Sequence, residues 1–523
     1  MKRLTSENLW IFLIVFIPAC AAGIYLNQVI DYIFVDAFKR SFAAYLVYFG
    51  NEPKLSAIGF VWPPIPTLLQ LPLVLIEPLN QSGLAGNILS SILLGVSAVY
   101  LNLIAVMYNV KKSFRYILLL LFVTNPLILF YGINGMSELI GIGFITMAIY
   151  YFLRHLSTNS LPSLVFASLA VACATMTRWE MGILLFVVLV IIAYIPFVNK
   201  KYSFQEAESS VVVFAVPIFF AISIWLVTSW LIVGSPIYFL HSPYSFTAHD
   251  AKQLSGSSVL SDARGSVWLS FLFVFERILY LSAAFIPFFA LLVNKLRNKA
   301  ERLHALTLLG FASSVIFAHI LLIYVGKSYG ELRYYIYVIP FSYMFLMFLF
   351  KNTISKSKQK IRVLLFFVAS AVLMLATSVL TYTAMSQYEY GNQEYIVIDI
   401  LKGKHNVTKS YTFKKEEVIA RYIASHIKTR SVLVDDSVGF IIVYLTRKPN
   451  LFIETVDSDF KQTLADPVNS KAEYLLISNQ DTHSGVNILN VEYPTLYKKG
   501  ADFVTLEKDF GDWRLYKIIK PTK

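Results

Sequence analysis

Charged residues are scarce in this chain. Only 15% of its 523 residues are Asp, Glu, Lys or Arg, and 57% are apolar, whereas roughly a quarter of the residues of an ordinary soluble protein are charged. This composition excludes a soluble protein. There are also only two cysteines, Cys20 and Cys173, and both lie in or near apolar stretches. We expect them to be small core residues, without a disulfide or metal framework.

Several other features are absent. The sequence contains no fixed-period repeat, no Gly/Ser linker and no low-complexity tract. No His or Cys pattern with metal-ligand spacing accompanies the acidic residues, and no Gly-rich phosphate loop follows a strand-like run. Such patterns are what metal and nucleotide sites usually require. We therefore assign no metal ligands, no nucleotide to the C-terminal part and no cofactor; the sequence leaves open whether a divalent metal is needed.

The net charge of +13 has to be located before it can be interpreted. The first 384 residues carry 26 basic and 14 acidic residues, while the last 139 carry 19 and 18, so the excess lies in the apolar part. A nucleic-acid-binding protein would instead concentrate basic residues on a soluble module. We expect no nucleic-acid partner and attribute the excess to membrane topology.

Long apolar runs dominate the first part of the chain. The hydrocarbon core of a bilayer is about 30 Å thick and needs about 20 mostly apolar residues per helix, within a range of about 17 to 25. Eleven stretches meet this requirement, and the fifth is the weakest candidate: 9–26, 86–108, 116–133, 137–153, 161–176, 181–198, 211–233, 268–293, 305–325, 334–350 and 363–383.

The basic content of the intervening loops alternates. One set of loops holds 17 Lys and Arg residues and the other holds 8, and such residues accumulate on the cytoplasmic side. This predicts a multi-pass protein of the cell membrane with a cytoplasmic N-terminus and an external C-terminus. Residues 1–26 also have the pattern of a signal peptide, because Lys2 and Arg3 precede an apolar run that ends in small residues. We predict a retained first span.

The sequence changes character after Thr383. Short helical and strand-like runs alternate there: 416–427, 431–435, 438–445 and 474–478. Such alternation predicts a small α/β domain. We therefore expect a polytopic α-helical membrane domain over 1–384, followed by an extracytoplasmic soluble α/β domain over 385–523.

The first outer loop, 27–85, contains the run Ile58-Gly-Phe-Val-Trp-Pro-Pro-Ile-Pro66. Proline cannot continue a regular helix, so the chain must break at this run. We expect it to re-enter as an amphipathic helix over 67–79 that lies on the membrane surface.

Ionisable residues at the outer ends of the spans point to a functional site, because placing them there costs free energy and requires a partner or a purpose. Each also has an ordinary explanation. Asp36 and Arg40 have the spacing of an exposed helical ion pair. Arg178 could pair locally, and Arg333 beside its tyrosines could anchor the chain at the interface. Function is favoured because these residues share one side of the membrane: Asp31, Asp36, Glu138, Arg178, Glu180, Glu331 and Arg333.

A set of motifs in this order resembles a known family. The motifs are Asp36-Ala-Phe-Lys-Arg40, Ala57-Ile-Gly-Phe-Val-Trp-Pro-Pro64, Asn125-Pro126 with Gly132-Ile-Asn-Gly-Met-Ser-Glu138, Leu332-Arg333-Tyr334 followed by Pro340, and Val434-Asp-Asp436 with Trp513-Arg-Leu-Tyr516. Together they resemble the GT-C glycosyltransferases, which include the protein O-mannosyltransferase-like family 39 and the aminoarabinose lipid A transferases. The resemblance covers most of the chain. It departs at Ala37, where some relatives have a paired Asp-Glu, so either Asp36 or Asp31 could be the important acid.

The resemblance implies a GT-C fold and the transfer of a sugar, with inversion, from a polyprenyl phosphate to an acceptor hydroxyl at the outer face. Asp36, or alternatively Asp31, would accept the proton of that hydroxyl. Glu138 would be a second acid in the same cavity. Arg333 and Arg178 would stabilise the leaving phosphate. The other substrate-binding candidates are Arg40, Trp62 and Tyr334. The rings of Trp62 and Tyr334 could stack on the sugar or gate the lipid, or serve only at the membrane interface.

The sequence leaves several points open. We expect a hexose, but the acceptor could be a protein, a wall polymer or a lipid. A transporter or flippase of a lipid-linked sugar or other solute is the main alternative; such proteins often show inverted repeats around a midplane site. No repeat is seen. Glu276 and Arg277, near the middle of the eighth predicted span, favour the transporter, but a local pair buried against a neighbouring helix also explains them. A catalytically inactive assembly protein would tolerate replacement of Asp36.

Overall fold

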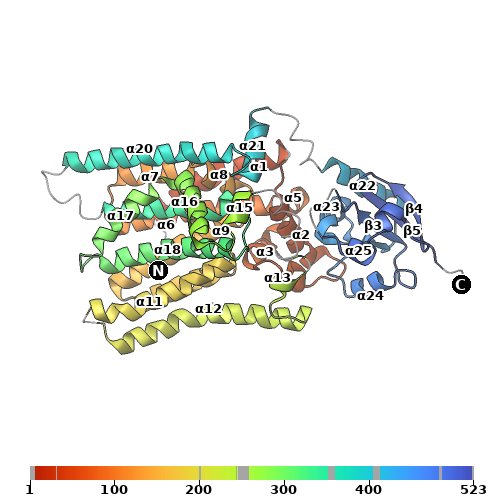
Figure 1. Ribbon diagram of the computed structural model, residues 1–523, viewed down its shortest axis with the longest axis horizontal. Helices are drawn as coiled ribbons and strands as arrows, with labels where there is room; N and C mark the ends of the chain where they lie inside the picture. The colour runs from red at the N-terminus through yellow and green to blue at the C-terminus, as the bar shows by residue number, and fades with distance from the viewer. Residues whose placement is uncertain are drawn as a thin grey trace. The chain divides into compact units, whose positions relative to one another are not determined.

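The computed structural model in Figure 1 describes residues 6–30, 32–199, 202–242, 244, 258–350, 360–403, 413–481 and 486–520. The chain divides into two compact units, each assembled from segments that are distant in sequence. The helical unit consists of Met1–Ala37, Leu84–Trp225 and Ser257–Val407, and the mixed unit consists of Phe38–Gly83, Leu226–Gly256 and Thr408–Lys523. Much of the first outer loop therefore belongs to the same unit as the C-terminal residues.

The predicted apolar stretches are helical. In the described residues, eight helices are long and apolar enough to cross a membrane, or up to ten if each of two bent helix pairs counts as one span. The elements concerned are α1 (Ser6–Gln28), α6 (Ala85–Met107), α7 (Lys112–Val123) with α8 (Pro126–Ile133), α9 (Glu138–Thr158), η2 (Trp179–Gly182) with α11 (Ile183–Val198), α12 (Phe204–Val233), α16 (Val267–Ser282) with α17 (Phe285–Lys295), α18 (Arg302–Tyr324), η4 (Leu332–Tyr335) with α19 (Val338–Leu349), and α20 (Lys360–Met385).

The fifth predicted stretch forms α10 (Leu161–Thr175), which has 15 residues. At about 1.5 Å per residue it is about 22 Å long, shorter than the hydrocarbon core of a bilayer. The chain nevertheless returns along α10 to the first turn of α9. This is shown by Arg178, shortly after α10, which donates a hydrogen bond to Glu138.

The bend between α7 and α8 has a local cause. Their axes differ by 66° across a short break, which consists of Thr124 and Asn125 and is followed by Pro126, the first residue of α8. The Asn125 side chain accepts hydrogen bonds from the backbone N–H groups of Leu127 and Ile128 and so caps α8. Proline at the first position of a helix needs no backbone donor. The sequence therefore ends one helix and starts another at this point.

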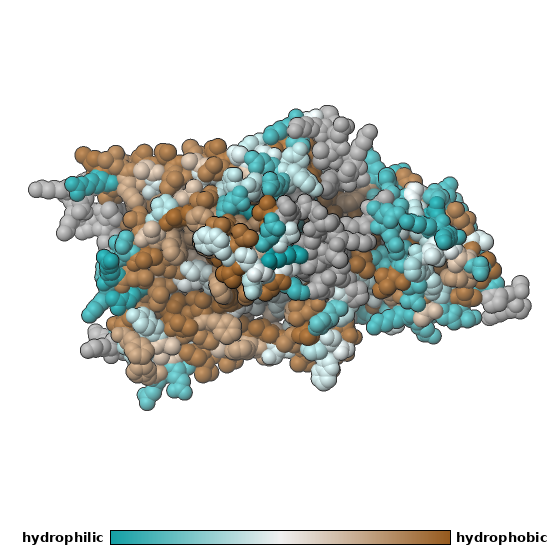
Figure 2. All heavy atoms as spheres, viewed as in Figure 1, coloured by the Kyte–Doolittle hydropathy of each residue, from teal (hydrophilic) through white to brown (hydrophobic). Residues whose placement is uncertain are grey.

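The helices of the helical unit pack closely around α6 and α9. α6 packs against α1 and α9, and α9 also packs against α10. Close approach depends on small residues: a Cβ atom added at Gly132 of α8 would lie 2.6 Å from the Leu94 side chain of α6. Small residues commonly allow such contacts between membrane helices. Hydrophobic side chains cover much of the surface of these helices in Figure 2.

His304, near the start of α18, links three helices at one end of the helical bundle. Its ring nitrogens lie 3.3 Å from the Tyr108 hydroxyl, directly after α6, and 3.1 Å from the Ser157 hydroxyl, near the end of α9. These residues adjoin loops that the sequence assigns to one side of the membrane. The opposite end of α9 is Glu138, so His304 and Glu138 lie at opposite ends of this helix.

The C-terminal residues form an α/β fold, which confirms that prediction. The sheet order is β2-β1-β3-β5-β4. β1 pairs in parallel with β2 and β3, while β5 is antiparallel to β3 and β4. Leu433 of β1 lies opposite Leu475 of β3, which lies opposite Tyr516 of β5. The strands are β1 (Val432–Val434), β2 (Phe452–Ile453), β3 (Tyr474–Ser478), β4 (Val504–Asp509) and β5 (Trp513–Ile518).

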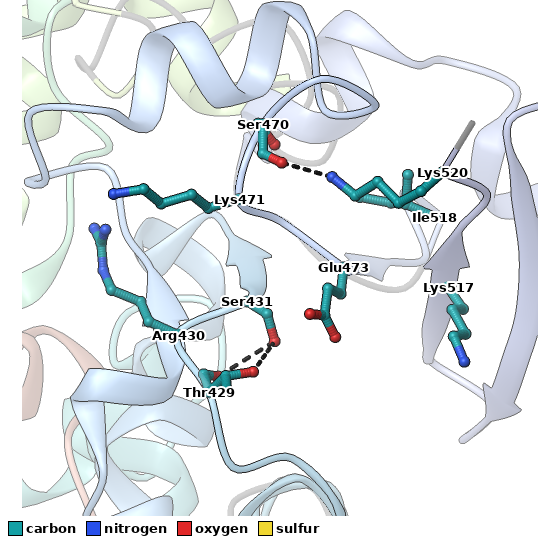
Figure 3. A pocket seen from close by; sticks show the side chains of 9 residues that line it. All are labelled: Thr429, Arg430, Ser431, Ser470, Lys471, Glu473, Lys517, Ile518 and Lys520. Carbon is teal, nitrogen blue, oxygen red and sulfur yellow. Dashed lines mark hydrogen bonds between the residues drawn. The ribbon is translucent and has the colours of Figure 1, made fainter. Parts of the chain in front are cut away.

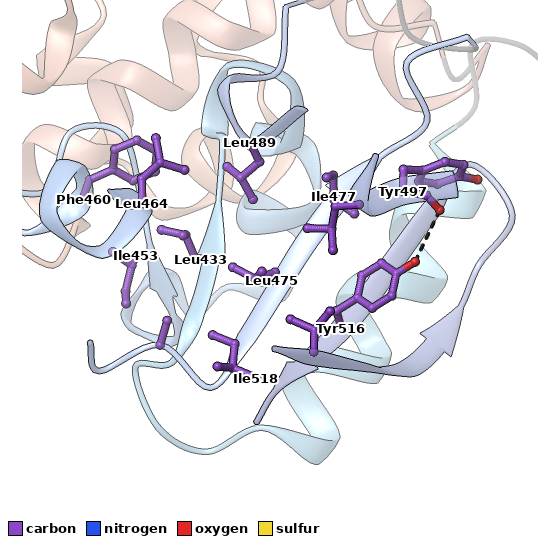
Figure 4. Packing of buried hydrophobic residues seen from close by; sticks show 13 residues of the cluster. Leu433, Ile453, Phe460, Leu464, Leu475, Ile477, Leu489, Tyr497, Tyr516 and Ile518 are labelled. Atoms are coloured by element: carbon purple, nitrogen blue, oxygen red, sulfur yellow. Dashed lines mark hydrogen bonds between the residues drawn. The ribbon is translucent and has the colours of Figure 1, made fainter. Parts of the chain in front are cut away.

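Helices cover both faces of this sheet. Successive strand residues point to opposite faces. On one face, Val434 and Trp513 point toward α23, where both lie near Gly439. On the other face, strand residues pack against Phe460 and Leu464 of α24 and Leu489 of α25 and form the core shown in Figure 4. These strand residues are Leu433, Leu475, Ile477, Tyr516 and Ile518. The helices here are α22 (Lys414–His426), α23 (Asp436–Thr446), η7 (Pro449–Leu451), α24 (Phe460–Ala465), α25 (Ile488–Glu492) and α26 (Leu496–Lys499).

The first outer loop is helical but broken. A single amphipathic helix over 67–79 is wrong, because Pro66, Pro72 and Pro78 each occupy the first or second position of a separate short helix. The elements of this loop are α2 (Val35–Phe49), η1 (Leu55–Ile58), α3 (Ile65–Leu68), α4 (Leu71–Val74) and α5 (Glu77–Ser82). The remaining short helices are α13 (Tyr238–His241), α15 (Ser258–Ala263) and α21 (Asn392–Leu401).

Candidate functional site

Several element starts of the helical unit bring charged residues together. Asp36 lies in the first turn of α2 and Glu138 begins α9. Arg178 is the residue before η2, and Arg333 lies within η4. Both short 3-10 turns precede long apolar helices, so each holds its arginine next to the end of a span. Four of the residues predicted from the sequence therefore meet in one cluster.

Glu138 is the buried centre of this cluster. Its side chain is 0% exposed, and its Oε1 lies 2.8 Å from Nη1 of Arg178 and 3.9 Å from Nε of Arg333. Its Oε2 has no hydrogen-bond partner among the described residues. A buried carboxylate is costly unless positive charge compensates it. Glu138 is therefore suited to holding the two guanidinium groups rather than to reaching an acceptor.

Arg178 and Arg333 differ in how fully they are engaged. Arg178 uses Nη1 for Glu138 and places Nε 2.5 Å from Oε1 of Glu180. Arg333 places Nε 2.5 Å from Oε2 of Glu331, but its Nη1 has no hydrogen-bond partner among the described residues. Arg333 thus retains donor capacity that could bind an anion.

Asp36 is the acid nearest to that spare donor. Its Oδ2 lies 3.8 Å from Nη1 of Arg333, beyond hydrogen-bond distance, and its side chain is 41% exposed. Arg333 is thus a cationic neighbour of Asp36, in addition to the helical pair with Arg40 that the spacing allows. An exposed carboxylate beside an incompletely bonded guanidinium can accept a proton on one side and stabilise negative charge on the other.

Tyr334 lies between the two arginines. The guanidinium carbons of Arg178 and Arg333 lie 5.4 and 5.3 Å from the centre of its ring, and Arg333 is also 5.9 Å from the ring of Phe34. These distances are within the range of cation–π attraction. The Tyr334 ring therefore helps to fix both cations, which a membrane-interface tyrosine would not need to do.

Glu394 of α21 is a residue that the sequence did not single out. It is buried, and the Tyr131 hydroxyl donates a hydrogen bond of 2.6 Å to its Oε1. The Tyr32 hydroxyl bonds to the neighbouring Gln393 at 3.1 Å. Burial raises the pKa of Glu394 to about 7, although the Tyr131 hydrogen bond acts in the opposite direction. No local pattern marks Glu394, since its partner is 263 positions away.

Arg40 and Trp62 form a separate pair in the mixed unit. The Arg40 guanidinium carbon lies 4.6 Å from the centre of the Trp62 ring, and Nζ of Lys39 lies 5.7 Å from the same ring. Lys39 also donates a hydrogen bond of 3.0 Å to the backbone carbonyl of Ser437. Asp31, the alternative acid, lies outside the described residues.

Glu276 and Arg277 form a local pair. Their side chains meet at 3.1 Å, and Nε of Arg277 donates a 3.0 Å hydrogen bond to the carbonyl of Gly330. The Tyr390 hydroxyl donates to Glu276 at 2.7 Å. These partners lie shortly before η4 and shortly after α20, next to the ends of spans. The pair therefore gives no support to a transport site at the middle of the membrane.

The C-terminal sheet carries a concave region, shown in Figure 3. It encloses about 630 Å³ before the starts of β1 and β3. Two of its four cations have partners within the domain: Arg430 lies 2.8 Å from Asp457 and 2.7 Å from Asp459, and Lys520 donates to the Ser470 carbonyl at 2.6 Å. Lys471 and Lys517 extend in different directions in Figure 3. We therefore give this groove no ligand.

In the part of the chain that the structure describes, no group of three His, Cys, Asp or Glu side chains is arranged to hold a metal ion. Each carboxylate of the cluster faces a guanidinium instead, which is the usual way to compensate buried negative charge without a metal.

Comparison with known proteins bears on the fold. No protein-family model and no curated protein matches the chain. The crystal structure of ArnT from Cupriavidus metallidurans in the apo state is similar over 99% of this chain and 100% of that chain, with 12% identity and a TM-score of 0.54. The archaeal oligosaccharyltransferase AglB from Archaeoglobus fulgidus, in complex with an inhibitory peptide and a dolichol-phosphate, is similar over 89% of this chain and 69% of that chain, with 11% identity and a TM-score of 0.45. The chain thus has the GT-C fold, a polytopic α-helical membrane domain followed by a C-terminal α/β domain.

Proposed function

We propose that the protein is an integral membrane glycosyltransferase. It takes a sugar, which we expect to be a hexose, from a polyprenyl-phosphate donor and joins it with inversion to an acceptor hydroxyl at the outer face of the membrane. The observation that carries this proposal is the separation of 3.8 Å between Oδ2 of Asp36 and Nη1 of Arg333. A proton acceptor and an anion-binding donor are thereby held side by side.

Asp36 is the proposed general base. As the acceptor oxygen forms its bond to the anomeric carbon, the acceptor proton passes to the Asp36 carboxylate. The bond between the anomeric carbon and the phosphate oxygen breaks, and its electron pair leaves with the polyprenyl phosphate. The base must lie in hydrogen-bond reach of the acceptor, and the 41% exposure of the Asp36 side chain permits that approach.

Arg333 is the proposed ligand of the phosphate. The phosphate gains negative charge as it leaves, and a preorganised guanidinium stabilises such charge at little reorganisation cost. Arg333 has the spare Nη1 donor, whereas both Nε and Nη1 of Arg178 already contact carboxylates. Arg178 and Glu138 are therefore proposed to position Arg333. If Arg333 is not the phosphate ligand, Arg178 is the alternative.

Arg40 and Trp62, in the mixed unit, are proposed as candidate substrate-binding residues on their own pairing alone. Their stacked pair presents an aromatic face and a cation together, a combination suited to a phosphorylated lipid at an interface. The protein would span the cell membrane with its N-terminus in the cytoplasm and its C-terminal domain outside.

The test is to incubate the purified full-length protein in lipid vesicles with radiolabelled polyprenyl-phosphate glucose or mannose and a membrane extract, and to fractionate the products. Label transferred to protein, wall polymer or lipid by wild type, but not by Asp36→Asn, supports the proposal and identifies the acceptor. Movement of intact labelled donor between leaflets without transfer would support the flippase alternative instead. Equal transfer by wild type and Asp36→Asn would exclude Asp36 as the base.

A further inference from the structure

Two histidines on α18 have contrasting environments. Both ring nitrogens of His304 have a hydroxyl neighbour, Tyr108 at 3.3 Å and Ser157 at 3.1 Å. His319 lies about 22 Å further along the helix at 1.5 Å per residue and is 2% exposed. Neither of its ring nitrogens has a hydrogen-bond partner among the described residues. Buried polar groups are nearly always hydrogen-bonded in folded proteins, so His319 differs from its neighbour on the same helix.

The ring of His319 forms part of the charged cluster. It stacks on Tyr334, with ring centroids 6.3 Å apart and planes 16° apart, and it lies 5.3 Å from the ring of Tyr335. The same Tyr334 ring is flanked by Arg178 and Arg333. His319 therefore lies beside the groups to which the proposed function assigns the donor phosphate.

Two tyrosines in or just after η4 also have hydroxyls without a partner among the described residues. The hydroxyls of Tyr335 and Tyr337 are buried and have no hydrogen-bond partner in the described part of the chain. Tyr337 approaches α9 closely, since a Cβ added at Gly141 would lie 2.8 Å from its hydroxyl. Gly141 is one helical turn from Glu138, whose Oε2 is also unpartnered in the described structure. Unpartnered polar atoms thus lie on α9, on α18 and on the segment from Tyr335 to Tyr337 in the described structure.

We propose that His319, together with the hydroxyls of Tyr335 and Tyr337, binds hydroxyl groups of the sugar carried by the donor. This proposal rests on the proposed function. A neutral imidazole offers one donor and one acceptor, and a tyrosine hydroxyl offers both, which matches the hydroxyl groups of a sugar ring. The phosphate is assigned to Arg333 instead, because its Nη1 is a guanidinium donor without a hydrogen-bond partner among the described residues.

The test separates the sugar from the phosphate. Wild-type protein and variants, full length and in lipid nanodiscs, are titrated with polyprenyl phosphate and with polyprenyl-phosphate glucose and mannose. His319→Phe keeps a ring that can stack on Tyr334 but removes both nitrogens. His304→Phe is the matched control on the same helix. We expect His319→Phe to bind the preferred sugar-bearing lipid about fivefold more weakly, which corresponds to about 1 kcal/mol, and to bind polyprenyl phosphate as wild type does.

The outcomes are distinct. An equal loss of affinity for both lipids, or no loss for either, would overturn the sugar-binding role of His319 and leave the proposed function intact. A wild-type protein that binds none of the three lipids would overturn the proposed function and this inference with it. If His319→Phe does not fold, Tyr335→Phe, which removes a single oxygen, replaces it: a selective loss for the sugar-bearing lipid supports the subsite, and unchanged selectivity overturns it.

Discussion

Oε1 of Glu138 lies 2.8 Å from Nη1 of Arg178, and the Glu138 side chain is completely buried. The pair joins the first turn of α9 to Arg178, which lies three residues after the end of α10. It therefore links these two helices at the end of the helical unit that carries the charged cluster. Removing one partner of a buried ion pair leaves an uncompensated charge, which costs more than the pair itself contributes.

We therefore predict that Glu138→Gln destabilises the protein by about 3 kcal/mol, measured by denaturant-induced unfolding in mixed micelles. The control is Glu417→Gln, which removes the exposed helical pair of Glu417 with Arg421 and should cost only about 0.3–0.5 kcal/mol. Similar stability for both variants would mean that Glu138 does not hold Arg178 in this way.

Glu394 is expected to make the stability of α21 depend on pH. Its pKa in the folded protein, about 7, lies above its ordinary value of 4.5 because of burial. The folded state therefore favours the protonated carboxyl. The associated stability is complete below the ordinary pKa and is lost as the pH rises through 7.

Amide hydrogen exchange in α21, corrected for the intrinsic effect of pH, should accordingly be faster at pH 8 than at pH 6. Glu394→Gln mimics the protonated carboxyl and should abolish this difference, whereas replacement of the exposed Glu507 by Gln should preserve it. A pH dependence that persists in Glu394→Gln would assign the effect to another group.

The membrane helices could be predicted because their signal is local. A span needs only enough apolar residues in succession, and a helix satisfies its own backbone hydrogen bonds, so no knowledge of its neighbours is required. The breaks were less predictable. The 67–79 helix was wrong because Pro66, Pro72 and Pro78 each start a new turn, and proline allows either a break or a start according to context.

The site could be predicted only in part, for the same physical reason. Asp36, Glu138, Arg178 and Arg333 were recognisable because charge at the end of a span is costly in itself. Whether a polar group is already satisfied depends on tertiary contacts. Glu394 acquires its role from a tyrosine on α8, and the difference between His304 and His319 follows from what α6, α9 and η4 place beside α18.

The loop charges predict the sidedness of the protein. In a variant without Cys20 and Cys173, a cysteine introduced at Ser425 of α22 should react with a membrane-impermeant thiol reagent in intact cells, because the C-terminal domain is expected outside. A cysteine at Ser203 should react only after the membrane is made permeable, since the adjacent basic residues favour the cytoplasm. Labelling of Ser203 alone in intact cells would reverse the orientation.

Asp36→Asn tests the proposed base. The substitution keeps the shape of the side chain but removes its basicity, so the transfer rate should fall about 10²–10⁴-fold. Stability should stay near that of wild type, because the side chain is well exposed. Transfer above a tenth of the wild-type rate, with an inactive Asp31→Asn, would move the role to Asp31. Full activity in both variants would discard the mechanism.

Arg333→Lys separates a phosphate ligand from an interface anchor. A bidentate phosphate contact depends on the planar guanidinium, whereas lysine binds as a point charge. An anchor needs only a long cationic side chain that reaches the head groups, and lysine provides that equally well. We predict that Arg333→Lys reaches the membrane in normal amount but transfers sugar at least about tenfold more slowly, equivalent to about 1.4 kcal/mol of barrier. Arg302→Lys, at the opposite end of the helices, should transfer at the wild-type rate. Near-normal transfer by Arg333→Lys would leave Arg333 as an anchor and shift the phosphate role to Arg178.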